Sequence, residues 1–466
     1  MTPVRTVARS KPAAEAETEA AAPVGAGLGG RKLRVLLSAE ACNPSWSSVP
    51  LVGYNIARAL TGRDDLDVTL VTNVRNKDAL ECDPLRRETE IHYIDNDFIA
   101  GPFFRFARKI RGGITLGWTL NTALMWPSYM VYERMIYQRF GRDLRRGRFD
   151  LIHRVTPVTP VLGSPLTSWT DVPMVIGPLN GGLPWPEEFP KLRRLEREWL
   201  IPFRRLHTLL PYHQSTAVRA AGLIAASRHT ASELAPGPGA RFYLPENGVD
   251  PARFPLAEAW NPPPAAGAPF RFITVGRLAP VKVIDLILRA MSASEILRSC
   301  RLMIVGDGPE RDSLHDLTRS LGLESVTEFV GWIDQTRLAE CLRGCQAFVF
   351  PSIKDFGGGA VLEAMASALP AIVADYGGPS ELVTNDTGIR LPIEAADDLV
   401  VTLRTAMERL AADHALCGRL GAAAARRVRE QFTWSAKAER IVTYYHEVLR
   451  RRALAEELEP EGTTRR

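Results

Sequence analysis

Residues 350–363 read Phe-Pro-Ser-Ile-Lys-Asp-Phe-Gly-Gly-Gly-Ala-Val-Leu-Glu, which predicts a strand end, a glycine loop and a helix start in succession. The apolar run 347–350 is typical of a buried strand, and Pro351 ends it. Three glycines allow the backbone to approach a ligand closely, and the apolar spacing becomes helical from Val361. The N-terminus of such a helix offers free N–H groups and the positive end of the helix dipole, so it favours an anion such as phosphate.

Two carboxylates, Asp355 and Glu363, bracket this glycine loop. Acceptor groups this close to a phosphate cradle suit sugar hydroxyls better than the phosphate itself. The stretch therefore predicts a site for a sugar that is attached to a phosphate. A glycine triplet alone is often only a flexible connector, so the interpretation needs support from elsewhere in the chain.

A second loop, rich in cations, gives that support. Residues 270–278 read Phe-Arg-Phe-Ile-Thr-Val-Gly-Arg-Leu, a strand that ends at Gly276, and Arg277 and Lys282 lie in the loop beyond it. A helix is expected from Ile284. Two cations at the C-terminal edge of a strand suit a diphosphate, which Arg grips with its planar fork and Lys contacts as a point charge. A solvated charge pair is the plain alternative, and the glycine loop favours the diphosphate.

The N-terminal half shows the alternation of a doubly wound α/β sheet. A strand is expected over 32–38, a loop over 47–54, a helix over 55–60 and another strand over 68–72. Further along, 172–183 repeats the pattern of a strand followed by a glycine loop. That loop is either an ordinary turn or a backbone approach to a ligand.

Together these motifs resemble the retaining GT-B glycosyltransferases of family 4. The resemblance covers roughly residues 31–450, in the family's order. The matching stretches are 276–282, Val305-Gly-Asp-Gly-Pro-Glu310, Phe329-Val-Gly-Trp332, Asp355 with Glu363, Asp375-Tyr-Gly-Gly-Pro379, Pro245-Glu-Asn-Gly-Val-Asp250 and Phe432-Thr-Trp434. The resemblance implies an α/β GT-B fold, in which two Rossmann-like doubly wound domains face a central cleft.

The resemblance also implies roles on the donor side of that cleft. Arg277 and Lys282 would neutralise the donor diphosphate, and Glu363 would hold the nucleotide ribose. The backbone of three glycines would complete the diphosphate cradle: Gly276, Gly358 and Gly359. The base would lie at Trp332 and Ile333, and the transferred sugar at Asp355, Phe356 and Gly357. Asp355 stands where the family usually has a glutamate, one methylene longer, which indicates tuning of sugar specificity.

On the acceptor side the resemblance implies loops at Ser47 and Ser48 and at Gly181 and Gly182. It also places His153, the polar end of an expected strand, beside the reacting centre, so Asp355 and His153 are the candidate catalytic residues. From the residues alone, a single histidine at a strand end is more often structural.

The implied reaction moves a hexose from a nucleotide diphosphate sugar to an acceptor hydroxyl with retention of configuration. Two alternatives stay open: a catalytically degenerate sugar-nucleotide-binding protein, and a nucleotide-sugar epimerase of the same fold. An NAD-dependent dehydrogenase is disfavoured, because no Gly-x-Gly-x-x-Gly motif follows the first strand. We expect the nucleotide sugar to act as co-substrate, with no cofactor and no metal. The triplets Asp65-Leu-Asp67 and Asp95-Asn-Asp97 are short enough to arise by chance, and the phosphate charge already has cations.

The resemblance also implies the domain organisation. It comprises a disordered tail (1–30), an acceptor-side Rossmann-like domain (31–255), a linker (256–267), a donor-binding Rossmann-like domain (268–432), a crossover helix that packs on the N-terminal domain (433–452) and a tail (453–466). At 466 residues and 45% hydrophobic content, the chain can build two domains with sizeable cores.

Charge is unevenly distributed along the chain. The net charge of +5 is too small to indicate nucleic acid, but residues 101–148 hold ten Arg and Lys against two acids, and 191–205 add six more cations. Both stretches contain aromatic residues, which favours peripheral contact with an anionic membrane; a solvated helix face is the alternative. Residues 112–132 carry no charge but are diluted by polar residues, so we expect a buried or interfacial pair of helices, with a re-entrant segment left open.

The chain's surroundings are inferred from the same features. Residues 1–30 lack the apolar core of a secretory signal, and the six scattered cysteines indicate reduced thiols. We therefore expect a cytoplasmic protein at the inner face of the plasma membrane, acting in the synthesis of a bacterial cell-surface or lipid-linked glycan. Its expected partners are a nucleotide sugar donor and a glycan or lipid-linked acceptor.

Overall fold

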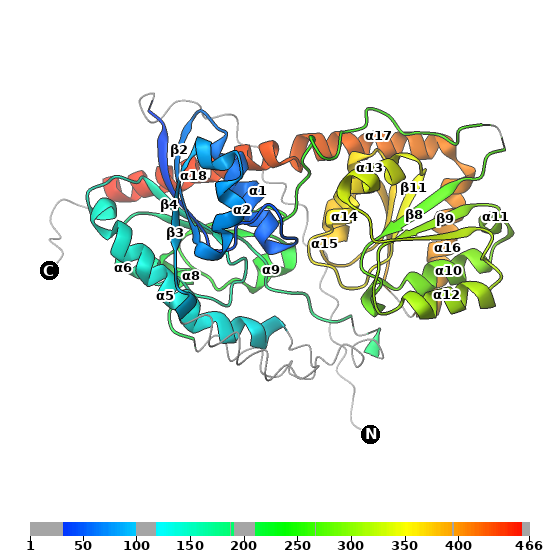
Figure 1. Ribbon diagram of the computed structural model, residues 1–466, viewed down its shortest axis with the longest axis horizontal. Helices are drawn as coiled ribbons and strands as arrows, with labels where there is room; N and C mark the ends of the chain where they lie inside the picture. The colour runs from blue at the N-terminus through cyan, green and yellow to red at the C-terminus, as the bar shows by residue number, and fades with distance from the viewer. Residues whose placement is uncertain are drawn as a thin grey trace, which may run out of the picture.

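The computed structural model describes residues 31–98, 118–186, 188–190, 210–265, 267–393 and 396–458, with only the backbone described for 118–124. The predictions for residues 1–30 and for the basic residues of 101–117 and 191–205 lie outside these ranges. Figure 1 shows two α/β bodies side by side, one from the N-terminal half of the chain and one from the C-terminal half.

Each body contains one parallel sheet. The first has the order β3-β2-β1-β4-β5-β6-β7 and the second the order β10-β9-β8-β11-β12-β13. The strands of the first are β1 Leu33–Ala39, β2 Leu66–Asn73, β3 Glu90–Ile94, β4 Leu151–Thr156, β5 Met174–Leu179, β6 Gly222–Ala225 and β7 Ala240–Tyr243. Those of the second are β8 Arg271–Val275, β9 Arg301–Val305, β10 Thr327–Gly331, β11 Ala347–Phe350, β12 Ala371–Ala374 and β13 Gly388–Leu391.

The strand order reverses direction at one point in each sheet, between β1 and β4 and between β8 and β11. Ligands of open α/β sheets bind in the crevice beyond the C-terminal strand ends at such a switch point. The crevice of the second sheet therefore lies where Gly276 follows β8 and Pro351 follows β11.

Helices cover both faces of the sheets. In the N-terminal half they are α1 Val49–Thr61, η1 Val74–Asn76, α2 Lys77–Glu81, α3 Leu85–Glu88, α5 Trp118–Arg145, α6 Leu166–Trp169, α8 His213–Arg219 and α9 Arg228–Glu233. In the C-terminal half they are η3 Pro280–Lys282, α10 Ile284–Ser292, α11 Glu295–Arg298, α12 Arg311–Ser320, α13 Gln335–Arg343, α14 Gly359–Ala366, α15 Gly377–Leu382, α16 Ala396–Ala412, α17 His414–Gln431 and α18 Trp434–Leu458.

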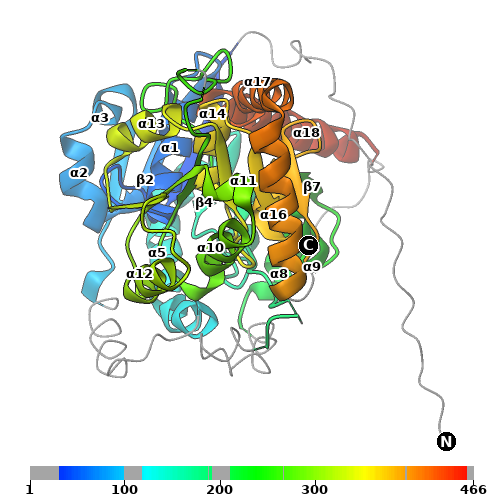
Figure 2. The ribbon, with the colours of Figure 1, turned by 90° about the vertical axis from the view of Figure 1, so that its right-hand side faces the viewer.

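The last two helices connect the halves. Figure 2 looks from the C-terminal body and shows α17 at its edge, with α18 continuing behind it. Buried residues of α18, including Ile441 and Tyr445, share a core with β1 and α1. The helix continues to Leu458, beyond the expected end at 452, because residues 453–458 are mostly strong helix formers.

Two expectations for the N-terminal half need correction. The helix expected over 55–60 begins at Val49, because Pro50 lies in the first turn, where its missing N–H costs nothing. The pair of helices expected over 112–132 is, in its described part, a single helix α5 with Pro127 inside it.

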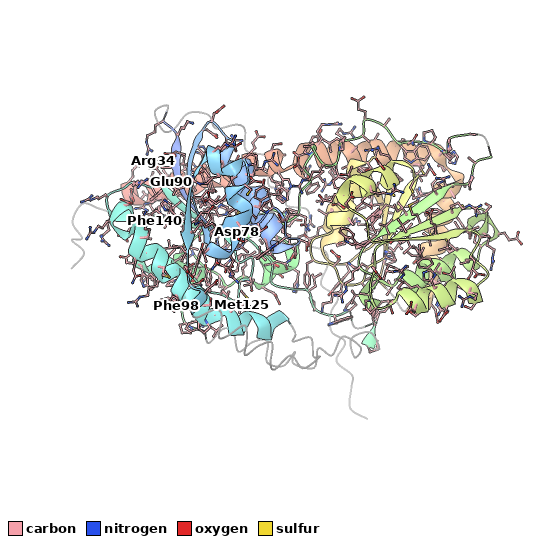
Figure 3. All side chains as sticks on the ribbon, viewed as in Figure 1. Arg34, Asp78, Glu90, Phe98, Met125 and Phe140 are labelled. Carbon is pink, nitrogen blue, oxygen red and sulfur yellow. The ribbon has the colours of Figure 1, made fainter. Side chains whose placement is uncertain are left out.

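Helix α5 packs along the sheet rather than standing apart from it. Tyr132, Ile136 and Phe140 of this helix are buried. Phe140 is labelled on α5 in Figure 3, and its ring meets that of His92 on β3 edge to face at 4.9 Å. Within the described ranges, every helix is too short or too polar to cross a membrane.

Candidate functional site

The cationic loop and the glycine loop are joined at the switch point of the second sheet. The N–H of Ile353 donates to the carbonyl of Val281 at 3.0 Å, and the hydroxyl of Ser352 donates to the same carbonyl at 3.1 Å. These bonds hold the segment after β8 beside the segment after β11. The two motifs that the sequence analysis treated separately therefore form one surface.

Lys282 and Asp355 form an ion pair across this surface. Nζ of Lys282 contacts Oδ2 of Asp355 and lies 4.6 Å from the centroid of the Phe350 ring. The other oxygen of Asp355, Oδ1, accepts hydrogen bonds from the N–H groups of Gly357 at 3.2 Å and Gly358 at 2.8 Å. The side chains of the pair are only 15% and 20% exposed, so little water screens the interaction.

The glycine loop owes its shape to steric limits. Gly358 has φ of +58°, a left-handed conformation that favours glycine, and a Cβ there would lie 2.7 Å from Cδ1 of Leu382. Helix α14 begins at Gly359, two residues before the position expected from the apolar spacing. A Cβ at Gly359 would make only ordinary contacts, the nearest at 3.6 Å to Nδ2 of Asn247. Gly358 is thus packed against Leu382, whereas Gly359 at the start of α14 has only ordinary contacts.

Glu363 follows on α14, partly exposed. Burial raises the pKa of its carboxyl to about 7. Among the described residues, none donates a hydrogen bond to this carboxyl and none pairs with it as a cation. An acceptor placed this way is suited to hydroxyl donors from a ligand, because they would replace the hydrogen bonds that burial has removed.

The remaining donor-side candidates lie around this centre. Gly276 follows β8 with φ of +154°, and Arg277 after it is exposed. Trp332, 78% exposed, and Ile333 follow β10, two strands away from β8. Phe356 at the tip of the glycine loop is 38% exposed.

The loop after β5 reaches the glycine loop through residues that the sequence analysis did not single out. The N–H of Gly182 donates to Oδ1 of Asn180 at 3.2 Å, and Nδ2 of Asn180 donates to Oε2 of Glu246 at 3.0 Å. A Cβ at Gly357 would lie 2.7 Å from Oε1 of Glu246 and 2.1 Å from Nδ2 of Asn247. Glu246 and Asn247 were quoted within the motif 245–250, but only the fold brings that motif against Gly357.

Direct contacts hold the two bodies face to face beside this site. Glu381 of α15 accepts hydrogen bonds from the N–H of Arg228 at 2.9 Å and from the hydroxyl of Tyr243 at 2.7 Å, both in the N-terminal half. In the other direction, Trp185 and Phe189 are buried in the core of the C-terminal body. Helices α14 and α15 lie on the side of that body that faces the N-terminal one (Figure 1).

His153 departs from its expected place. Its ring is fully buried; Nδ1 lies 2.6 Å from the hydroxyl of Tyr445, and Nε2 lies 2.8 Å from the carbonyl of Gly177. Burial lowers the pKa of His153 to about 4, so the ring is neutral, donating from Nε2 and accepting at Nδ1. Both nitrogens are occupied within the N-terminal body and α18, which favours the structural role over the expected catalytic contact.

The other acceptor-side residues, two glycines and two serines, differ in their contacts. The N–H of Gly181 donates to the hydroxyl of Thr230 at 2.9 Å, within the N-terminal body. Ser47 and Ser48 are exposed before α1, and Ser48 has φ of +63°. Within the described chain, neither serine forms a hydrogen bond with the glycine loop.

In the described ranges, the acidic triplets and the cysteines are not arranged as metal ligands. Those ranges contain no group of three or more His, Cys, Asp or Glu side chains that could hold a metal ion. Asp65 is instead paired with Arg63, whose hydrogen bond holds the pKa of the aspartate below its ordinary value.

Comparison with known proteins links this site to a family. Residues 260–426 match the family described as "Glycosyl transferases group 1". D-inositol 3-phosphate glycosyltransferase of Kineococcus radiotolerans is 32% identical over 208 residues, which are 40% of this chain and 46% of the relative. Glycogen synthase of Mycobacterium tuberculosis is 32% identical over 212 residues, 45% of this chain and 49% of the relative. The chain thus spans about half the length of these curated relatives.

Solved structures extend the similarity to both bodies. Sucrose-phosphate synthase from Thermosynechococcus elongatus superposes with a TM-score of 0.61 at 18% identity, covering 90% of this chain and 100% of that one. Anabaena HepE in complex with UDP gives 0.57 at 17% identity, covering 89% and 100%. At such identities the likeness concerns the fold alone. With the two parallel sheets, it confirms the GT-B fold predicted from the sequence.

Proposed function

We propose that this protein is a glycosyltransferase that moves a hexose from a nucleotide diphosphate sugar to an acceptor hydroxyl, with retention of configuration and without a metal. The observation that carries the proposal is the arrangement of Lys282, Asp355 and Glu363 around the start of α14. The family match over residues 260–426 supports the same assignment, because it includes all three residues.

The geometry of the site suggests a role for each of its residues. The helix start and Lys282 would stabilise negative charge on the departing diphosphate, and the exposed guanidinium of Arg277 would join them from the end of β8. Glu363 would accept hydrogen bonds from the ribose, with the base near Trp332 and Ile333. Asp355, anchored by two N–H groups, would face the transferred sugar together with Phe356.

The transfer breaks the bond between the anomeric carbon and the diphosphate oxygen and forms one between that carbon and the acceptor oxygen. The acceptor's proton passes to the departing phosphate, so no protein base is needed. This agrees with a buried His153 that has no free nitrogen.

The donor and acceptor are proposed only as classes. The similar Anabaena protein is described with UDP bound, so a uridine nucleotide is the first donor to try. From the basic, aromatic composition of 101–148 and 191–205, we propose a glycan or lipid-linked acceptor at the inner face of the plasma membrane.

Thermal-shift and transfer assays with UDP-, GDP- and ADP-hexoses test the proposal. One donor should stabilise the protein, and Glu363→Ala should abolish that shift. Arg277→Ala combined with Lys282→Ala should lower transfer by at least about 100-fold, since each lost contact to a developing charge costs a few kcal/mol. Arg319→Ala on the exposed side of α12 is the matched control and should leave transfer unchanged. Transfer at the wild-type rate by the double variant would refute the assignment, and binding without transfer would favour the degenerate alternative.

A further inference from the structure

Glu246 links the two bodies at the glycine loop. It follows β7, and its Oε2 accepts the hydrogen bond from Nδ2 of Asn180 at 3.0 Å. Its Oε1 faces the C-terminal body, where a Cβ at Gly357 would lie 2.7 Å away. Among the described residues, none donates a hydrogen bond to Oε1. One oxygen is therefore anchored and the other is directed at the loop assigned to the transferred sugar.

The charges around Glu246 favour an uncharged hydrogen-bond donor as the partner of Oε1. Burial raises the pKa of its carboxyl, and the negative charge of Asp355 adds to the rise, whereas the hydrogen bond from Asn180 and the charge of Lys437 oppose it. The carboxyl groups of Glu246 and Asp355, one from each body, thus lie close enough for their charges to interact. Hydroxyl groups can donate to both, but another anion would be repelled by both.

Lys437 of α18 fixes the backbone on either side of Glu246. The lysine is 1% exposed, and its Nζ donates to the carbonyl of Pro245 and, at 2.9 Å, to that of Asn247. Burying an ammonium group without a bonded carboxylate is costly, and burial lowers the pKa of Lys437 to about 7. The two carbonyls are turned toward Nζ, and the Glu246 side chain between them extends to Asn180 and Gly357.

We infer that Glu246 is a further specificity-determining residue of the proposed site, accepting at Oε1 a hydrogen bond from a hydroxyl of the transferred hexose held against Gly357. Lys437 is its positioning residue. The inference rests on the proposed function and deepens it: it assigns the recognition of one sugar hydroxyl to the N-terminal side of the cleft, opposite Asp355.

The test compares hydroxyl groups one at a time. UDP-glucose, GDP-mannose and ADP-glucose are screened with the wild-type protein, and monodeoxy derivatives of the transferred donor are then assayed with wild type, Glu246→Gln and Glu246→Ala. One deoxy position should lower kcat/KM of the wild type by about 10- to 100-fold, the range for a hydrogen bond to a charged group. Removal of the same hydroxyl should not lower kcat/KM of Glu246→Ala any further. Glu246→Gln keeps the shape of the side chain and the acceptor for Asn180, so its loss of kcat/KM on removal of that hydroxyl should lie between those of the wild type and Glu246→Ala.

Controls separate this role from a structural one. Binding of UDP, GDP or ADP alone should be unchanged in Glu246→Ala, because the nucleotide contacts lie on the C-terminal body. Lys437→Met should weaken discrimination against the same deoxy donor, whereas a purely structural lysine would lower stability and leave that ratio unchanged. Glu430→Gln, an exposed glutamate on α17, is the matched substitution and should behave as wild type.

Three outcomes would overturn the inference. If every hydroxyl contributes equally in wild type and Glu246→Ala, Glu246 recognises none of them. If the variant instead raises KM for the acceptor while all donor hydroxyls keep their contributions, the recognised hydroxyl belongs to the acceptor ring. If no donor binds the wild type, the proposed function fails and this inference fails with it. If a donor raises the melting temperature in a way that depends on Glu363, but the Glu246 variants discriminate among deoxy donors as the wild type does, only this inference is refuted.

Discussion

Replacing Glu363 by glutamine should stabilise the protein while removing donor binding. Burial raises the pKa of this carboxyl from 4.5 to about 7, without a compensating cation or hydrogen-bond donor among the described residues. Between these two values the folded state retains a proton that the unfolded chain has lost. The free energy of unfolding therefore falls as the pH rises from about 4.5 to about 7, and the penalty is constant above that window.

The size of the effect follows from the two pKa values. A tenfold change in an equilibrium constant corresponds to about 1.4 kcal/mol, so the step from 4.5 to about 7 sets an upper limit of about 3 kcal/mol. Glu363→Gln keeps the shape of the side chain and removes its charge. We expect a gain of about 1–3 kcal/mol at pH 8 that disappears near pH 4, where the wild-type carboxyl is protonated in both states.

Urea unfolding of wild type, Glu363→Gln and the exposed control Glu430→Gln at pH 8, 6 and 4 measures this gain. The control should stay within about 0.5 kcal/mol of wild type at each pH. A Glu363→Gln variant no more stable than wild type at pH 8, or equally more stable at every pH, would show that the carboxyl has a partner or that water reaches it freely. The reasoning about an unsatisfied site carboxylate would then be wrong.

Three other predictions concern the framework of the site. Gly306→Ala should cost about 3 kcal/mol in urea unfolding, because φ is +132° and its Cβ would lie 1.9 Å from the carbonyl oxygen of Gly276; Gly322→Ala, at φ of +66° with nothing nearby, should cost about 1 kcal/mol, and equal losses would contradict the proposed contact. Burial lowers the folded-state pKa of His153 from 6.5 to about 4, so the free energy of unfolding of the wild type should fall by up to about 3 kcal/mol as the pH drops from 6.5 to about 4. His153→Gln should lack this fall, and parallel pH profiles of the two proteins would contradict a buried, neutral histidine. The pKa of Lys437 is lowered from 10.5 to about 7, so wild-type stability should rise between pH 7 and pH 9 by up to about 3 kcal/mol, a rise that calorimetry should find missing in Lys437→Met.

The features predicted from the sequence are those set by short-range rules. The glycine loop, the strand before it and the helix after it follow from apolar spacing and from the conformational freedom of glycine, all within residues 347–366. The fold with two Rossmann-like domains was expected from the resemblance, and the alternation of strands and helices in the N-terminal half agrees with it. The start of α1 at Val49 was missed because a proline within the first turn resembles a loop in sequence.

Long-range contacts explain most of what the sequence did not reveal. Lys437 lies on an amphipathic helix, where a lysine usually faces solvent, and its acceptor carbonyls are 192 and 190 residues away. His153 shares the pattern of a strand-end polar residue with many catalytic histidines, and Tyr445, which occupies its Nδ1, is 292 residues distant. A hydrogen bond between segments this far apart leaves no periodic signal in one sequence.

The two oxygens of Asp355 give the site separate functions for loop shape and for charge. Oδ1 holds the N–H groups of Gly357 and Gly358, whereas Oδ2 holds Lys282. A diphosphate carries more negative charge than one carboxylate. A bound donor would therefore compete with Oδ2 of Asp355 for Lys282, without disturbing the hydrogen bonds at Oδ1. The glycine loop could therefore keep its shape if the lysine turned to a donor phosphate, and Oδ2, once released, would become an acceptor for a sugar hydroxyl. Under the proposed function, diphosphate binding itself would prepare the carboxylate that recognises the sugar.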